Sequence, residues 1–338
     1  MTAAPAMFSH PAWLRAVLAH VPDDGLMLDK GLSPPFAFHA LRQKGFPIAR
    51  AEAFQSALTP SALPSAANAP SIAEARAYLD RLAMPLILRN VPSQHPVMQG
   101  LLEAACHVRV LKQWQRAGLK LTGTFDDWLM SNFDHKRRKE LKRLRARLAE
   151  QGALTLDCLK PGGDLASHVA AFLTVEVAGW KGKRGTAIGN DPKLVKGLQQ
   201  GLAAMHALGK VRFWTLRLDG RPIASLFALV DGGEATLGKI CHDENLGKYS
   251  PGVLLIIDAT EDLFSDPAIT FADANAIPGH PMIDRIWRDR IACMDVVIAG
   301  PVVNSLTFRA VALGYGMKDA TRSAIKRIYL RVTGRRSS

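Results

Sequence analysis

The chain has 338 residues, of which 48% are hydrophobic, enough for a full core in one large domain or two ordinary ones, and this excludes a disordered protein. The 43 Lys and Arg residues exceed the 30 Asp and Glu residues, giving a formal net charge of +13. We therefore expect an acidic partner, although charge alone does not choose among nucleic acid, a phosphate-bearing cofactor and an anionic membrane surface.

The N-terminus MTAAPAMFSHPAWLRAV lacks the features of a secretory signal, and no other segment approaches the roughly 20 apolar residues of a membrane span. The cysteines lie far apart in sequence and form no zinc-binding spacing; they are Cys106, Cys158, Cys241 and Cys293. We expect reduced thiols, without disulfide or structural metal, in a cytoplasmic protein that meets a membrane only from its inner face.

Prolines and glycines break the first 120 residues into short extended segments such as PPFAFHALRQKGFPIARAEAF and PLILRNVPSQHP. Between these segments lie an alanine-, serine- and proline-rich stretch at 57–71 and the helical sequence EARAYLDRLA. The pattern predicts a domain of mixed sheet and helix, with a surface loop at 57–71.

The next segment, DDWLMSNFDHKRRKELKRLRARLAEQG, predicts one long helix that ends at Gly152. Phe133, Leu141, Leu144 and Leu148 are spaced to form one apolar stripe, and the other faces are crowded with lysine and arginine. Such a helix could cross a nucleic-acid backbone, but no interleaved aromatic residues or recognition-helix signature accompany it. A solvated helix between domains, which also steers an anionic cofactor, is the interpretation that the sequence favours.

After Gly152, a strand (ALTLDCL) and a helix (DLASHVAAFLTVEVAGW) precede the loop KGKRGTAIGND and the helix PKLVKGLQQGLAAMHALG. A hairpin follows in VRFWTLRLDGRPIASLFALVD, with Asp219-Gly220 as its turn, and EATLGKICH is a third strand. The loop DENLGKYSPG then leads into a helix and a further strand at AITFADANA.

The junction KYSPGVLLIIDA at 248–259 predicts an apolar helix with Ser250 as its N-cap and Pro251 in its first turn. Gly252 is unexpected in that turn, because glycine weakens a helix relative to alanine, and it indicates a close approach to the backbone. A phosphate is one candidate, since free N–H groups and the positive end of the helix dipole meet there and Lys248 adds a charge. A well-capped core helix is the other interpretation.

Four segments in this order resemble the GNAT fold of acyl-CoA-dependent transferases, specifically the bacterial CelD/BcsL-type acetyltransferases, which are similar to the Fem aminoacyltransferases. They are DHKRRKELKRLRARLAEQG, GWKGKRGTAI at 179–188, LDGRPIAS at 218–225 and HDENLGKYSPGVLL at 242–255. The resemblance implies an α+β fold of tandem GNAT-like domains, with mixed twisted sheets flanked by helices. The implied parts are a degenerate N-terminal domain at 1–124, a basic linking helix at 125–151, the acyltransferase domain at 152–312 and a basic C-terminal helix or tail at 313–338.

The resemblance also implies where acyl-CoA or acetyl-CoA would bind. In this family a strand splays from its neighbour, the pantetheine arm lies in the gap, and the following loop and helix N-terminus receive the diphosphate. Carried over, the diphosphate contacts are Lys248, Tyr249, Ser250, Gly252 and Val253. Backbone groups at Lys239, Ile240 and Cys241 would face the thioester carbonyl. Acyl-carrier protein is an alternative donor, and no metal is implied.

Acyl transfer to an amine needs a base for the ammonium proton. Asp243 is the first choice, with His242 as helper or competing base, and the alternative for both is an ordinary polar loop start. Glu176 lies one helical turn before Trp180, and Asp273 lies on the following strand; Glu176 is also typical of a surface or ion-paired position.

The loop GWKGKRGTAI presents Lys181, Lys183 and Arg184 among three glycines, a composition suited to closing over a phosphate or an anionic acceptor. Trp180 would then form a wall of the acyl pocket. A core tryptophan beside solvated cations is the competing interpretation.

The end of the chain, DATRSAIKRIYLRVTGRRSS, predicts a helix with apolar residues on one face and basic residues around it. This pattern is typical of a membrane-surface helix, and a helix packed on the protein's own core fits it equally well.

Together these features predict a cytoplasmic acyl-CoA-dependent N-acyltransferase, in possible peripheral contact with the membrane. Its acceptor would be an amine of a cell-envelope component, either an amino sugar of a polysaccharide or a long-chain amino lipid such as a sphingoid base. The alternatives are a Fem-like aminoacyl-tRNA-dependent transferase and a non-catalytic nucleic-acid-binding module.

Overall fold

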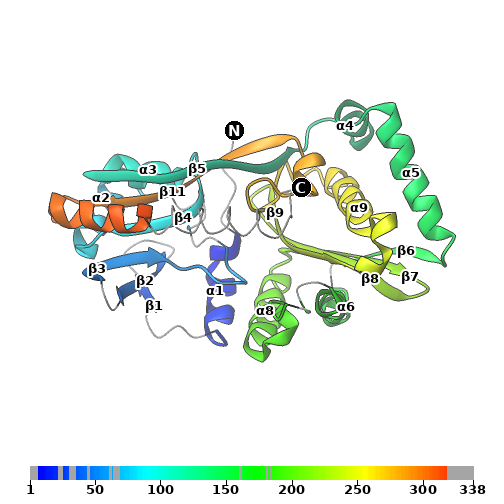
Figure 1. Cartoon of the computed structure of the whole chain (residues 1–338), viewed down its shortest axis with the longest axis horizontal. Helices are drawn as coiled ribbons and strands as arrows, with labels where there is room; N and C mark the ends of the chain where they lie inside the picture. Colours follow the sequence, from blue (N-terminus) through cyan, green and yellow to red (C-terminus); the bar gives the residue numbers. More distant parts are fainter. Residues whose placement is uncertain are drawn as a thin grey trace.

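The computed structural model describes residues 7–21, 26–29, 36–43, 46–60, 63, 69–159, 162–179, 182 and 184–317, without side chains at 26–29, 36–43 and 46–47. Within these ranges one sheet crosses the molecule, in the strand order β1-β2-β3-β4-β11-β5-β10-β9-β8-β7-β6 (Figure 1). Both halves of the protein thus share a single mixed sheet.

Residues up to 120, which we call the N-terminal half of the fold, supply α1 (Pro11–Leu18), β1 (Leu26–Asp29), β2 (Phe36–Gln43), β3 (Phe46–Ala53), α2 (Ile72–Leu82), β4 (Leu86–Pro92), α3 (Pro96–Ala104) and β5 (His107–Lys120). The C-terminal half supplies α4 (Phe125–Asn132), α5 (His135–Ala149), β6 (Leu154–Cys158), α6 (Leu165–Ala178), α8 (Pro192–His206), β7 (Val211–Leu218), β8 (Arg221–Asp231), β9 (Glu234–His242), α9 (Pro251–Ser265), β10 (Phe271–Asp273) and β11 (Asp289–Ala299). A last helix, described over 305–317, follows β11.

The unit β3–α2–β4 is repeated as β9–α9–β10. In each unit a helix joins two parallel strands that pair only briefly, at 51–52 with 86–87 in the first and at 234–236 with 271–273 in the second. Asn90 and Asn275 lie the same number of residues after the first paired residue of β4 and of β10, respectively. Both have positive φ values, 55° and 49°. The predicted tandem GNAT-like α+β architecture is therefore confirmed.

The strands that follow the two units are exchanged between the halves. β11 lies between β4 and β5, whereas the end of β5 pairs with β10 through residues 118–120. The N-terminal α1 also packs on α8, where a Cβ on Gly201 would stand 2.9 Å from the Trp13 ring. The chain thus crosses between the halves several times, and the domain boundaries at 124, 151 and 312 stay predictions.

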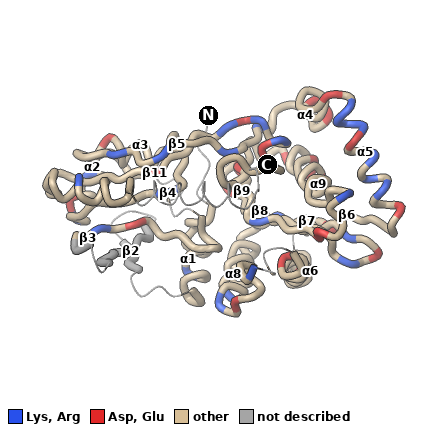
Figure 2. The backbone as a smooth tube through the Cα atoms, viewed as in Figure 1, with Lys and Arg blue, Asp and Glu red and all other residues tan. Residues whose placement is uncertain are grey.

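The basic segment forms two helices, so the expectation of one long helix ending at Gly152 is wrong. Phe133 adopts extended backbone angles between α4 and α5, and Asp134 caps α5 by accepting the N–H of Arg137 at 2.7 Å. An aspartate favours a helix start over a helix interior because its side chain binds nearby backbone N–H groups. Leu141, Leu144 and Leu148 of α5 are buried, as the predicted apolar stripe requires, whereas Phe133 is buried but lies in the break before α5. Basic residues follow α5 in Figure 2.

Helices cover both faces of the C-terminal part of the sheet (Figure 1). Successive residues of a strand point to opposite faces, so Trp214 packs with α5 and α9 while Phe213 packs with α1, α6 and α8. Two cores therefore hold β7, β8 and β9 in place. None of the helices in the described ranges has the length and apolar character that a membrane crossing requires.

Candidate active site

β9 and β10 diverge immediately after their short parallel pairing, at a point that we call the fork. Past Asp273 the chain turns away at Asn275, whose side-chain amide donates to the Leu237 carbonyl at 3.3 Å. The pairing of β9 with β10 ends at Thr236, and residues 238–242 of β9 continue beyond it. The fork therefore leaves one edge of β9 with backbone groups outside the ladder.

A β-bulge lies on β9 at the fork. Leu226 of β8 is opposite Ile240, but Ala228 is opposite Leu237, so the register shifts across Gly238 and Lys239. A Cβ on Gly238 would stand 2.1 Å from the Phe227 ring, which explains the glycine. Because a bulge redirects backbone groups, the N–H groups proposed to face a carbonyl, at Lys239 to Cys241, lie where the backbone changes direction.

Cys241 itself is a buried thiol. Its Sγ lies 3.5 Å from the Phe172 carbonyl oxygen and 3.7 Å from that of Ser225. These contacts suit a packed side chain, and only the backbone of Cys241 remains a candidate for carbonyl binding.

The start of α9 differs in detail from its prediction. Pro251 occupies the first turn as expected, and Ser250 is the N-cap residue. However, Ser250 has left-handed angles, φ 53° and ψ 51°, and its side chain makes no capping hydrogen bond. The expectation that the serine hydroxyl caps the helix is therefore wrong.

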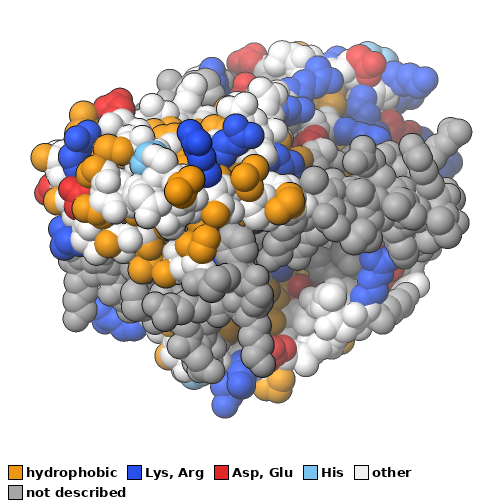
Figure 3. Space-filling model, turned by 60° about the vertical axis from the view of Figure 1, so that its left-hand side comes forward, with side chains coloured by type: hydrophobic (Ala, Val, Ile, Leu, Met, Phe, Trp, Pro, Cys, Tyr) orange, Lys and Arg blue, Asp and Glu red, His pale blue; other side chains and the backbone are white. Residues whose placement is uncertain are grey.

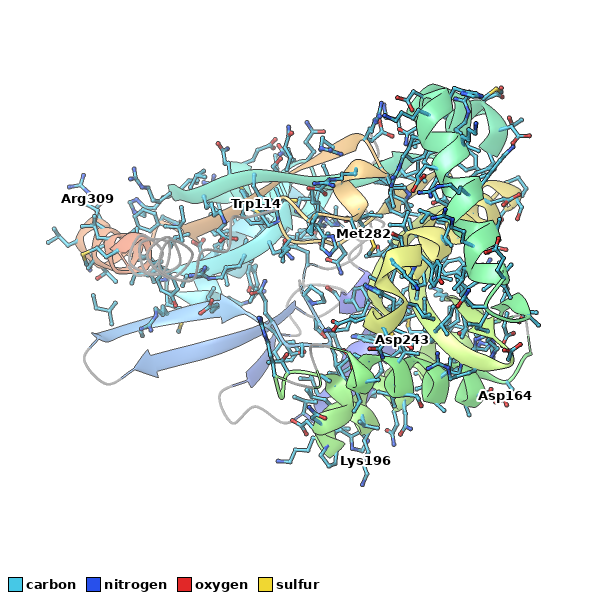
Figure 4. The ribbon with its side chains drawn as sticks, turned by 45° about the vertical axis from the view of Figure 1, so that its right-hand side comes forward. Trp114, Asp164, Lys196, Asp243, Met282 and Arg309 are labelled. Atoms are coloured by element: carbon cyan, nitrogen blue, oxygen red, sulfur yellow. The ribbon has the colours of Figure 1, made fainter. Side chains whose placement is uncertain are left out.

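Side chains fill the space beside Gly252. A Cβ there would stand 3.0 Å from Nδ1 of His242 and 3.3 Å from Sδ of Met282, so these two groups make the close approach that the glycine allows. Figure 4 shows Met282 and Asp243 toward the middle of the molecule, beside α9.

Two of the N–H groups expected to bind a diphosphate are already used within the chain. Val253 donates to the Ser250 carbonyl at 3.0 Å, and Ser250 donates to that of Gly247 at 3.0 Å. Tyr249 is buried, and Nζ of Lys248 lies 4.9 Å from the centre of its ring. The expectation of free N–H groups at Ser250 and Val253 is therefore wrong, and this corner does not fit a diphosphate without rearrangement.

His242 and Asp243 lie together at the end of β9. Oδ1 of Asp243 accepts the N–H of Asn245 at 2.9 Å, and Oδ2 accepts from Arg221 at 3.0 Å. The Arg221 side chain is 60% exposed and that of Asp243 12%, so solvent screens the arginine end of this ion pair. Of the four predicted acidic or basic candidates, His242 and Asp243 lie beside the start of α9, and Asp273 lies at the fork as the last residue of β10.

Glu176 is buried on α6 instead of lying on the surface. Its Oε2 accepts the N–H of Ile188 at 2.8 Å, which fastens the loop between α6 and α8. Arg184, on that loop, is exposed. Trp180, Lys181 and Lys183 lie outside the described residues. The hydrogen bond to Ile188 therefore indicates that Glu176 holds the loop between α6 and α8 in position.

Asp273 takes part in a buried ion pair between the halves. Its oxygens accept from Nε and Nη2 of Arg116 at 2.8 and 2.6 Å, and Oδ1 also accepts the N–H of Asn275 at 2.7 Å. Arg116 further donates to Oδ1 of Asn90 at 3.1 Å, so it contacts one repeated asparagine directly and the other through Asp273. These contacts suit a structural role better than that of a base.

Glu234, at the start of β9, was not among the site residues predicted from the sequence. Its buried Oε2 has no hydrogen-bond partner among the described residues, and burial, together with the charge of Asp273, raises its pKa from 4.5 to about 8. The carboxyl group is therefore protonated at neutral pH. No sequence signal marks it, because the cause is a neighbour that folding brings close.

A basic hollow of about 510 Å³ lies where α4 meets α5. Its lining includes Arg137 and Arg138 of α5 and Arg285 and Arg288 from the segment before β11. Arg138 donates to the Met130 carbonyl at 3.2 Å. Over the described ranges the other three arginines make no ion pair. The sequence marked the basic helix but not the two arginines that folding adds to it.

Comparison with known proteins supports the fold. Residues 135–273, which include the fork, match the family model of the acetyltransferase (GNAT) domain. None of the curated proteins matches the chain by sequence. The match to the acetyltransferase domain confirms the prediction of a GNAT-type N-acyltransferase. The finer assignment to the CelD/BcsL type stays a prediction.

Three solved structures illustrate the likeness over most of the chain. A conserved protein of unknown function from Bacteroides thetaiotaomicron is 10% identical, with 88% of this chain and 93% of that chain covered and a TM-score of 0.53. The C-terminal domain of a protein assigned as a lysylphosphatidylglycerol synthetase from Agrobacterium fabrum is 13% identical, with 93% of each chain covered and a TM-score of 0.53. FemX is 9% identical, with 82% of this chain and 87% of that chain covered and a TM-score of 0.50. At these identities the likeness concerns the fold.

Proposed function

We propose that the chain transfers an acyl group from an activated carrier to an amine, and that the reaction takes place at the fork. The supporting observation is the divergence of β9 and β10 beside a bulge at Gly238 and Lys239. An acyl carbonyl at this point would meet backbone N–H groups that β10 does not use. Such fixed donors stabilise the negative charge that develops on the carbonyl oxygen during attack.

The proton of the attacking amine needs an acceptor near this point. Attack forms the new C–N bond and breaks the bond to the carrier, while the ammonium loses a proton and the leaving group gains one. We assign the acceptor to Asp243, with His242 as its helper, because both lie at the end of the exposed edge of β9. Asp243 would first exchange its contact with exposed Arg221 for the amine or a bridging water.

Acyl-CoA or acetyl-CoA is the donor that the resemblance favours, with acyl-carrier protein as a variant, but the start of α9 does not fit a diphosphate as it stands. Movement of His242 and Met282 away from Gly252 would be needed first. Binding of CoA, acetyl-CoA and a long-chain acyl-CoA should each raise the melting temperature. Lys248→Glu should reduce this rise, and Gly247→Ala, where a Cβ meets open space, is the matched control. No rise with any of the three would contradict a CoA donor.

An aminoacyl-tRNA donor is the second candidate, and the basic hollow favours it. Three arginines that make no ion pair with any described residue lie there on two segments distant in sequence, and further basic residues follow along α5 (Figure 2). Converging like charges repel, so an anion at the hollow would be stabilised. We expect Arg285→Glu/Arg288→Glu to weaken tRNA binding and to lower its salt dependence. Binding of tRNA that both substitutions leave unchanged would refute this candidate.

We propose an amine of a cell-envelope component as the acceptor, either an amino sugar or a long-chain amino lipid, reached from the cytoplasmic side. A phospholipid synthetase among the structural neighbours supports this choice. Mass spectrometry of lipids and surface polysaccharide from a deletion strain should reveal an unacylated amine, and unchanged profiles of both would count against the assignment.

A further inference from the structure

An exposed apolar surface lies on the opposite end of the molecule from the basic hollow. The helix at 305–317 packs its inner face, Phe308, Val311 and Tyr315, onto Ile87 and Val297 of the sheet. Its outer face is also apolar: Leu306, Leu313 and Met317 are 78%, 64% and 67% exposed. A surface helix ordinarily presents polar residues to water, so an outer face on which Leu306 and Leu313 are exposed marks a contact surface.

Neighbouring segments extend this surface. Val302 precedes the helix and is 59% exposed, and Val110 of β5, which is 39% exposed, lines the groove beside the helix. Between β5 and the helix runs a groove of about 500 Å³ lined by Arg109, Val110, Leu111, Phe308, Arg309, Ala312, Leu313, Gly316 and Met317. In Figure 3, where this half comes forward, apolar side chains gather beside a group of basic ones. We call these residues the apolar-basic surface.

The helix is firmly seated, which makes the surface a fixed feature. The hydroxyl of Tyr315 donates to Oε2 of Glu52 and accepts from Nε of Arg50, both at 3.1 Å. His107 stacks on Phe308 at 5.1 Å between ring centres. The exposed leucines therefore stand on a rigid base.

The charge of the surface limits what can cover it. Arg109 and Arg309 line the groove, Lys112 follows on β5, and no acidic residue is among the groove residues. In a symmetric contact with a second copy, these cations would face one another without a neutralising carboxylate. Residues 318–338 are rich in lysine and arginine, so their positive charge would be repelled by the basic residues of the groove. An occupant must therefore combine apolar groups with negative charge.

We propose that the apolar-basic surface docks the protein on a bilayer that contains anionic lipid. Leucine, valine and methionine side chains would enter the headgroup boundary while Arg109, Lys112 and Arg309 bind lipid phosphates. Between residues 107 and 117, β5 pairs with β11 alone among the described strands, so its other edge keeps unpaired backbone groups. Such groups are costly in hydrocarbon, and the surface therefore rests at headgroup level.

The test measures sedimentation of the full-length chain with vesicles. Vesicles of phosphatidylcholine with about one third phosphatidylglycerol should carry the protein down, whereas phosphatidylcholine alone should not. The neutral variant Leu306→Ser/Leu313→Ser should bind about 10-fold more weakly, and Arg309→Glu about 5-fold more weakly with a reduced salt dependence. Leu208→Ser, at a 51% exposed leucine in the other half, is the matched control and should bind as the unchanged protein does.

Three results would overturn the proposal. The first is no sedimentation of the unchanged protein with anionic vesicles. The second is equal binding by the leucine variant, which would leave residues 318–338 as the membrane contact. The third is a dimer in solution that the leucine variant converts to a monomer without vesicle binding, which would identify a second copy as the occupant. Because no reaction is measured, none of these results bears on the proposed acyl transfer.

Discussion

Glu234→Gln should stabilise the protein at alkaline pH. The side chain of Glu234 is buried beside Asp273, and burial followed by that neighbouring charge raises its pKa from 4.5 to about 8. A carboxyl group with a raised folded-state pKa contributes stability that is complete below pH 4.5 and is lost as the pH rises toward 8. Glutamine stays neutral at every pH, so the variant should not suffer this loss.

The magnitude follows from the pKa difference between the folded and unfolded states. Each unit corresponds to about 1.4 kcal/mol, so the rise from 4.5 to about 8 sets an upper bound of about 5 kcal/mol at pH 9. Relaxation around a buried carboxylate reduces such values, and we expect about 3 kcal/mol in free energy of unfolding. For a chain of this size that corresponds to about 4 °C in melting temperature.

The assay is thermal unfolding of both proteins between pH 4 and pH 9. The two melting temperatures should agree near pH 4 and should separate progressively above pH 5, with the variant higher. Glu103→Gln, at an exposed glutamate of α3, is the control and should follow the unchanged protein throughout. Parallel curves for Glu234→Gln and the unchanged protein across the whole range would refute the assigned protonation state.

Three further substitutions test the fork and its surroundings. Gly238→Ala places a methyl group against the Phe227 ring and should lower the free energy of unfolding by about 3 kcal/mol in urea denaturation; a change as small as that of Gly247→Ala would contradict this packing. Asp273→Asn leaves Arg116 buried without its counter-charge and should cost about 3–5 kcal/mol, so near-native stability in the same assay would speak against the ion pair. Asp243→Asn keeps the cap on Asn245 and should leave the melting temperature unchanged, while kcat for acyl transfer falls about 100-fold or more. An unchanged kcat would remove Asp243 from the proposed mechanism.

The parts of the fold that sequence could predict are those that depend on local spacing. The apolar stripe at Leu141, Leu144 and Leu148 and the helix start at Pro251 are confirmed, because period and turn chemistry act within a few residues. The break between α4 and α5 was missed, although Asp134 was available as a capping signal.

The site was harder to predict because its contacts join distant segments. Gly252 correctly indicated a close approach, but the approaching atoms belong to His242 and Met282 and not to a phosphate. Asp273 was marked as an acid on the right strand, yet its partner Arg116 comes from β5, and only the folded chain brings the two together. Contacts between residues so far apart in the chain produce no periodic pattern that a single sequence could reveal.

The exchange of β5 and β11 makes each half depend on the other for its completion. A fragment limited to the segment of the GNAT match, 135–273, would lack β5. In that fragment β10 would pair with β9 alone, and its other edge would expose unpaired backbone groups to water. Such a fragment should aggregate when it is produced alone. Because the two halves share one continuous sheet, their motion relative to each other is restricted. Any opening that admits substrates must therefore come from loops and side chains around the fork.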